Sequence, residues 1–223
     1  MVTLLLSSKK VNLNHVDAEG NTPFHLAIHQ GSLEMIQLFI ESERVGEDAD
    51  FTLDQAVHYA VLLGSLDVIK LFFQFEKKFK NINRPDCKGD TVLHNAVFND
   101  HVEMVQFLLQ SQTIDINALD GLNRTPFLLA IAKGNLDIIK WFIQPNIQER
   151  LNLNSTDVNG YTALHAAIMH NHIALAKWII KSGRIDLIIT DYQVNTPLDL
   201  AKLRGDVDLI NLLTQAEGQH NLP

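Results

Sequence analysis

Ten histidines are the first candidates for chemistry, because imidazole both binds metals and transfers protons near neutral pH. His25 and His29 are spaced i,i+4, which would place both rings on one face of a helix, as zinc ligands require. The glutamate of an H-E-x-x-H motif does not accompany them. His165, His170 and His172 form a second group, but a predicted helix break separates them. These spacings give a metal site no specific support, and we expect none.

Cys87 is the single cysteine, in a predicted turn beside a lysine that would favour its thiolate. A catalytic thiolate needs a base held against it, and the nearest histidine, His94, has the structural role described below. The sequence has no G-x-G-x-x-G or G-x-x-x-x-G-K-[ST] phosphate loop, and no carboxylates are spaced as an acid–base pair. We therefore expect no catalysis and no cofactor.

Composition narrows the class of protein further. The chain has 223 residues, 46% of them hydrophobic, and a net charge of −8. This balance is typical of a folded domain, and the negative charge argues against nucleic acid as a partner. No apolar run approaches the roughly 20 residues of a membrane span, and Met1–Ser8 lacks the basic start of a signal peptide. We expect a soluble, intracellular protein that does not enter a membrane.

The elements that would position these residues recur along the chain. Six segments begin with aspartate and end, ten residues later, with alanine. Five of them contain a Thr at the sixth position, followed by Pro, Val or Ala and then an apolar residue. The alanines at 27, 60, 96, 130, 167 and 201 are separated by 33, 36, 34, 37 and 34 residues. This period indicates a repeat protein.

Each copy predicts a turn followed by two helices. Aspartate and glycine favour the turn, and Thr22, Thr125 and Thr196 are N-caps with proline directly behind them. A glycine, asparagine or aspartate then breaks the chain, at Gly31, Gly64, Asp100, Gly134, Asn171 and Gly205. An amphipathic second helix follows. Because neither helix buries its apolar side alone, neighbouring copies must stack into an all-α solenoid.

These residues resemble the ankyrin repeat, with its T-P-L-H helix start and a period near 33. We expect an incomplete leading repeat at 1–16, six repeats at 17–217 and a frayed tail at 218–223. The incomplete start favours a fragment of a longer protein over a truncated cap. The Asp50 copy has Gln55 and Ala56 in place of Thr-Pro, which predicts a distorted hairpin tip. Phe75–Asn81 is expected to prolong a helix, and Pro145 to open a loop through Glu149.

The resemblance assigns structural and binding roles. It implies that His25, His58, His94 and His165 orient each turn by hydrogen bonding to backbone. It places partner contacts at hairpin tips and at the exposed ends of first helices, on a concave face. Those positions carry large apolar residues, namely Phe51, Leu62, Leu63, Phe98, Leu122, Val158, Tyr161, Met169 and Tyr192. So many on one side suggest a binding patch, although some, Phe51 first, could instead fold onto neighbouring repeats.

We therefore predict a monomeric module that binds another protein through its concave face without catalysis. The alternative is the substrate-recruiting or regulatory part of a larger enzyme or of a bacterial effector delivered into a host cell. Plentiful asparagine and isoleucine favour an AT-rich genome, a setting in which such arrays are commonly effectors. A structural spacer without a partner is a third reading, which the apolar tips disfavour. The resemblance also predicts hydroxylation of Asn117, because Leu109 and Asp115-Ile116-Asn117 match the asparaginyl hydroxylase preference.

Overall fold

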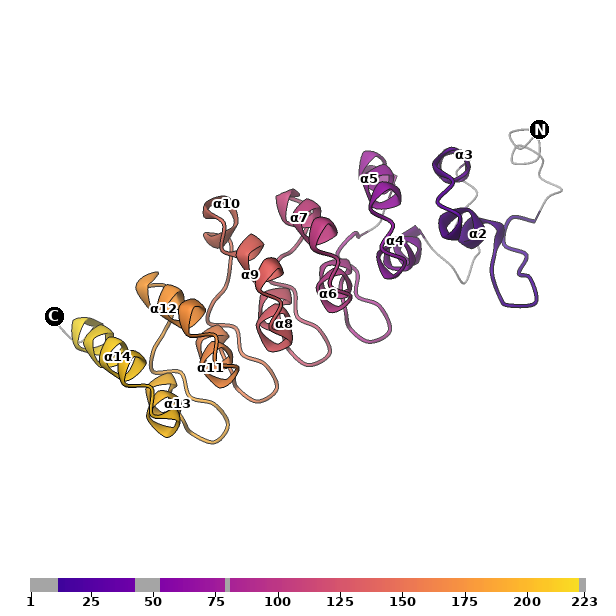
Figure 1. The fold of residues 1–223 in the computed structure, drawn as a ribbon. Coiled ribbons are helices and arrows are strands. Elements are labelled where there is room, and N and C mark those ends of the chain that lie inside the picture. Colours follow the sequence, from indigo (N-terminus) through magenta and orange to yellow (C-terminus); the bar gives the residue numbers. More distant parts are fainter. Residues whose placement is uncertain (1–11, 43–52, 79–80, 221–223) are drawn as a thin grey trace. The chain divides into compact units, whose positions relative to one another are not determined.

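A computed structural model describes residues 12–42, 53–78 and 81–220, and every regular element in these ranges is helical. The chain divides into two compact units, residues 1–87 and residues 88–223, each described by itself (Figure 1). The predicted all-α class is confirmed. Within the described ranges, no helix combines the length and apolarity that crossing a membrane demands.

The unit of residues 88–223 contains four stacked helix pairs. The pairs are α6 (Val92–Phe98) with α7 (Val102–Gln110), α8 (Pro126–Lys133) with α9 (Leu136–Phe142), α11 (Ala163–Met169) with α12 (Ile173–Lys181), and α13 (Pro197–Arg204) with α14 (Val207–His220). First helices contact one another in the order α6, α8, α11, α13, while α7 packs on α9 and α12 on α14. Figure 1 shows first helices in one row, second helices in another, and the hairpin loops beyond the first row.

The unit of residues 1–87 contains two pairs of the same kind. They are α2 (Pro23–His29) with α3 (Leu33–Glu41), and α4 (Leu53–Leu62) with α5 (Leu66–Gln74), followed by the 3-10 turn η1 (Glu76–Lys78). Helix α2 contacts α4, and α3 contacts α5. Both units are therefore built from the two-helix repeat that the sequence predicts.

Threonine begins the first helix of five repeats. The hydroxyl oxygens of Thr22, Thr91, Thr125, Thr162 and Thr196 each accept a hydrogen bond from the backbone N–H three residues ahead. Such a cap satisfies a donor that the helix leaves unpaired. In the copy without threonine, α4 begins at Leu53, although the other first helices begin at the position equivalent to Ala56. Residues 50–52, including Phe51, lie outside the described ranges.

The six repeat alanines are buried where successive first helices pack against each other. Ala27 is 4% exposed and the other five are completely buried. Their small side chains let successive first helices pack closely, while Phe24, Phe72, Phe127 and Phe142 fill the space between first and second helices. The six predicted breaks are also confirmed, because each adopts a positive φ between 59° and 74° that ends the first helix.

Two predicted connections are wrong in detail. Helix α5 ends at Gln74 and the separate turn η1 follows, so Phe75–Asn81 does not prolong the helix. Pro145 begins the short helix α10 (Pro145–Gln148) where a loop was expected, because proline suits the first position of a helix. Helix α14 includes residues 218–220, and the frayed tail stays a prediction.

Candidate functional site

The repeated histidines hold the turns, as the resemblance implies. His94 accepts a hydrogen bond at Nδ1 from the Thr91 N–H (3.3 Å), so Nε2 carries the proton and lies 2.9 Å from the Arg124 carbonyl oxygen. His165 repeats this arrangement with Thr162 and the Asn195 carbonyl. Burial lowers the pKa of both imidazoles, because it disfavours the charged form. These rings are neutral structural links between one repeat and the next hairpin.

The remaining suspects for chemistry do not converge. No three of the His, Cys, Asp and Glu side chains in the described ranges are grouped as metal ligands. The rings of His170 and His172 stack 6.3 Å apart, and His172 Nε2 lies 3.1 Å from the Ile131 carbonyl oxygen. Cys87 is exposed.

Aspartates shape the hairpin tips. One carboxylate oxygen of Asp120 accepts hydrogen bonds from the N–H groups of Leu122 and Arg124, and Asp157 and Asp191 do the same in their own hairpins. Burial alone would raise the pKa of Asp120, but the bonds from Arg124 and Leu122 outweigh it and lower that pKa. Adjacent tips are joined directly, since Tyr192 N–H donates to the Asn159 carbonyl at 2.9 Å. Hydrogen bonds within each hairpin and between neighbouring hairpins therefore hold the tips of the unit 88–223 in place.

An exposed residue recurs two positions after each buried repeat alanine. We call this set the first-helix row: His29, Leu62, Phe98, Ala132, Met169 and Leu203. All six are exposed, and the four large apolar members range from 41% for Met169 to 76% for Leu203. Three of these four are among the predicted contact residues. Leu203 is not, although it lies two positions after Ala201, as the repeat period requires.

The predicted tip residues are accessible with one difference. Leu122, Val158 and Tyr192 are exposed, Tyr192 most of all at 75%. Leu63, which directly follows the first helix α4, is exposed as well. Tyr161 is only half-buried and stacks on His165 with 6.0 Å between ring centroids, so part of its surface serves the repeat itself. In the unit 88–223, the hairpin loops extend beyond the row of first helices (Figure 1), and the last turns of these helices carry Phe98, Met169 and Leu203.

Two basic residues that the sequence does not mark as functional hydrogen-bond to the first-helix row. Lys133 donates to the Phe98 carbonyl and to Asp100, and its ammonium lies 5.0 Å from the Phe98 ring centroid. Arg204, at the equivalent position two repeats later, donates to the Met169 carbonyl at 3.0 Å. These contacts span 35 residues and fix the ends of neighbouring first helices.

Asparagines and arginines connect the loops that precede each hairpin. Asn117 Nδ2 donates to the Arg150 carbonyl at 2.7 Å, and its Oδ1 accepts from the Asn152 N–H at 2.8 Å. Asn154 makes the equivalent pair with Arg184 and Asp186. Both ends of the Asn117 amide are thus engaged, so hydroxylation, which stays a prediction, needs this loop to open.

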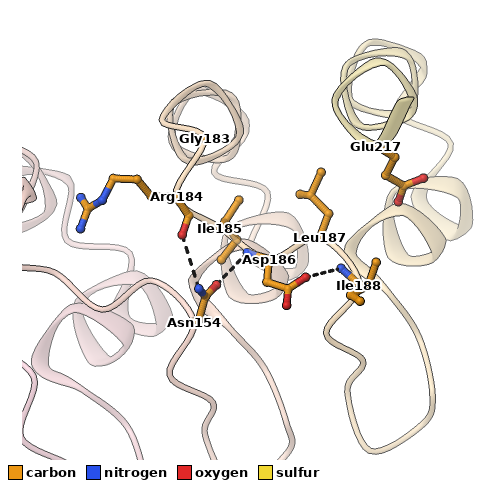
Figure 2. A pocket seen from close by; sticks show the side chains of 8 residues that line it. All are labelled: Asn154, Gly183, Arg184, Ile185, Asp186, Leu187, Ile188 and Glu217. Carbon is orange, nitrogen blue, oxygen red and sulfur yellow. Dashed lines mark hydrogen bonds between the residues drawn. The ribbon is translucent and has the colours of Figure 1, made fainter. Parts of the chain in front are cut away.

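A groove lies beside the last of these loops. It is lined by eight residues and has a volume of about 560 Å³ (Figure 2): Asn154, Gly183, Arg184, Ile185, Asp186, Leu187, Ile188 and Glu217. Seven of them come from the loops, and Glu217 comes from α14. No sequence pattern predicts this groove, because its residues come from separate repeats.

Comparison with known proteins agrees with the repeat geometry. A family model described as ankyrin repeats (3 copies) matches residues 1–83, 57–152 and 129–222. Alpha-latrotoxin-Lg1a of Latrodectus geometricus is 29% identical over 198 residues, which are 89% of this chain and 14% of the toxin. The SMC5-SMC6 complex localization factor protein 1 of Homo sapiens is 33% identical over 106 residues, 48% of this chain and 10% of that protein.

A bacterial relative is closer in length. A putative ankyrin repeat protein of Rickettsia bellii (strain RML369-C) is 28% identical over 141 residues, 60% of this chain and 75% of the relative. The chain therefore spans a small part of the first two relatives and most of this one. Since the family matches together run from residue 1 to residue 222, the chain belongs to the ankyrin-repeat family, whose repeats are protein–protein interaction modules.

Proposed function

We propose that this chain binds another protein through the concave face made by its hairpin tips and first helices, and that it performs no catalysis of its own. The observation that supports this proposal is the first-helix row, where large apolar side chains occupy one repeat position in four of six repeats and stay exposed. Solvent alone does not favour Leu, Phe and Met at a recurring exposed position, whereas a partner that buries them does.

The bracing of the row adds to this argument. Because Lys133 and Arg204 tie neighbouring first helices together, the row residues they contact are held in place before a partner arrives. A preorganised surface loses less conformational entropy on binding. The chain's net charge of −8 makes a protein a better partner than nucleic acid.

Affinity capture from cell lysate with quantitative mass spectrometry tests the proposal. One bait is the unmodified chain, and a second carries Leu62→Asp, Phe98→Asp and Met169→Asp on the first-helix row. A matched control carries Leu33→Asp, Leu136→Asp and Val207→Asp, which are exposed apolar residues at the starts of second helices. Thermal unfolding first establishes that all three baits are folded.

We expect a protein that the unmodified and control baits retain and that the row variant loses. If the row variant retains the same proteins as the control, the concave face is not the binding surface. Loss from the control alone would move the proposed surface to the second helices.

A regulatory or substrate-recruiting role within a larger protein is the second candidate. It is favoured by one observation, namely that this chain matches 14% of the toxin and 10% of the localization factor. The two roles are compatible, because the same face would then recruit a substrate or a neighbouring domain. Capture with the longest natural form of the protein as bait distinguishes them.

A further inference from the structure

The groove beside residues 183–188 has an apolar floor and a charged rim. Ile185 and Leu187 are buried beneath it, and Ile188 is 77% exposed at its edge. Its volume of about 560 Å³ is within the range of pockets that hold small ligands or single side chains of a partner. All of the lining residues belong to the unit 88–223.

The charges that remain available in the groove are negative. The Arg184 guanidinium points away from the other lining side chains (Figure 2). It donates hydrogen bonds to the backbone carbonyls of Gln148, Glu149 and Leu151. Asp186 uses one carboxylate oxygen to accept the Ile188 N–H at 3.0 Å. Glu217 receives no hydrogen bond or ion pair from any described residue. A cation therefore complements this rim better than an anion or a neutral group.

The groove lacks the asparagine that joins one loop to the next in the preceding repeats. In the two preceding loops an asparagine, 117 or 154, bonds the backbone N–H and carbonyl of the next loop. Residue 188 holds the equivalent position and is isoleucine, which offers neither a donor nor an acceptor. The loop of an additional repeat stacked here would have two backbone groups without the partners that asparagine supplies in the other loops.

We propose that this groove binds an arginine or lysine side chain within an extended segment of a partner protein. The aliphatic stem lies along Leu187 and Ile188, and the charged head reaches the carboxylates of Asp186 and Glu217. Long basic side chains bind in this way because their stems are apolar and their heads stay hydrated. This surface is separate from the concave face, so it provides a second contact that does not depend on the first.

Chemical-shift titration of the full ¹⁵N-labelled chain tests the proposal. The probe is acetyl-Leu-Arg-methylamide, and acetyl-Leu-citrulline-methylamide is its neutral match in shape. We expect saturable shifts of the amides of residues 183–188 with the arginine probe, and binding at least about threefold weaker with the citrulline probe, as loss of a partly exposed ion pair implies. Raising the salt concentration weakens only the charged probe.

Variants locate the contact. Glu217→Gln is expected to lower the affinity for the arginine probe about threefold, and Glu103→Gln, on the exposed side of α7, leaves it unchanged. Leu62→Asp, Phe98→Asp and Met169→Asp together also leave it unchanged, which separates this site from the concave face. Equal affinity for the two probes, equal effects of the two glutamate substitutions, or no saturable shift at residues 183–188 would each overturn the proposal.

Discussion

At the scale of single residues, Val194 has a backbone conformation unusual for its type. Its φ is 66°, whereas the equivalent positions in three other hairpins of the chain are Gly20, Gly89 and Gly160. A Cβ atom at Gly160 would lie 3.0 Å from the Asp191 Cα of the next hairpin, so glycine is needed there. Val194 faces no such neighbour in the described ranges and is 77% exposed. The left-handed conformation therefore costs energy without a packing benefit.

Val194→Gly is expected to raise the free energy of unfolding by about 1 kcal/mol, because glycine adopts this φ without strain. Urea unfolding followed by circular dichroism measures the change. Val194→Ala, which keeps Cβ but removes the branch, is the control and should lie between the two. A glycine variant less stable than the alanine variant would contradict the strain argument.

The buried histidines make stability depend on pH. Burial depresses the pKa of His94 and His165 in the folded state, while an unfolded histidine titrates near 6.5. Below about pH 6.5 these histidines bind protons in the unfolded chain but stay neutral in the folded chain. The free energy of unfolding is therefore highest above this pH and decreases as the pH falls below it. Each histidine contributes at most about 1.4 kcal/mol per pH unit.

We therefore expect the urea midpoint to fall between pH 7 and pH 5. His94→Gln lowers stability at pH 7, since glutamine cannot reproduce both bonds, but it makes the decline below pH 6.5 shallower. Parallel pH profiles for the variant and the unmodified chain would show that His94 is not a source of the dependence.

Asn117 can be tested at the same scale. Incubation with an asparaginyl hydroxylase followed by intact-mass and fragment analysis should add one oxygen at this residue. Arg150→Met is expected to speed the reaction, because it loosens the loop whose carbonyl binds the Asn117 amide. If neither the unmodified chain nor the Arg150→Met variant gains an oxygen, the predicted hydroxylation of Asn117 is wrong.

At the scale of elements, the side chain of Arg150 donates hydrogen bonds to three backbone carbonyl groups at and after the end of helix α7. Arg150 donates to the carbonyl oxygens of Leu109, Ser111 and Ile114 at 3.1–3.3 Å, and Arg184 repeats the pattern 34 residues later. The planar fork of the guanidinium reaches several acceptors at once, which an ammonium cannot do. The loops between second helices and hairpins are stabilised in this way.

Arg150→Lys should lower the free energy of unfolding almost as much as Arg150→Met, by about 2 kcal/mol, because carbonyls are left unpaired in both. Arg204→Met, which removes a single exposed bond, is the control and should cost under about 1 kcal/mol. Full rescue by lysine would show that charge, and not the fork, matters.

Sequence reasoning succeeds for elements set by local residues. Threonine caps, breaks at Gly31 or Asn171, and the alanine spacing all act within one repeat, so their patterns are readable directly. It fails where contacts join residues some 35 positions apart, as with Lys133 and the Phe98 carbonyl. The groove was missed for the same reason, because it forms only when a loop and α14 meet in space. The early start of α4 was missed because no cap marks it.

At the scale of the whole molecule, the alanine core and the first-helix row are neighbours with opposite requirements. Ala130 is completely buried, whereas Ala132, two residues later on the same helix, is exposed. Ala130→Glu is expected to unfold the surrounding repeats, since it buries a charge without a partner. Ala132→Glu should leave the thermal midpoint within a few degrees of the original.

Hydrogen exchange measured by mass spectrometry follows both variants. Loss of protection should centre on α8 and its neighbours in the Ala130→Glu variant and be absent in the other. Leu63→Asp, on an exposed position of the other unit, should also preserve protection. If Ala130→Glu and Leu63→Asp melt alike, the division between core and binding face is wrong.

The linked loops have a consequence for how such a protein acquires its length. Asn117 and Asn154 each bond the backbone of the next loop through the same pair of hydrogen bonds. A duplicated repeat therefore brings its own connection to the next copy, and the gene can lengthen without a new type of contact. Isoleucine at 188 has no side-chain donor or acceptor and cannot form this pair of bonds. A single codon change at this position, from isoleucine to asparagine, would restore the donor and the acceptor with which a further copy of the loop could be joined.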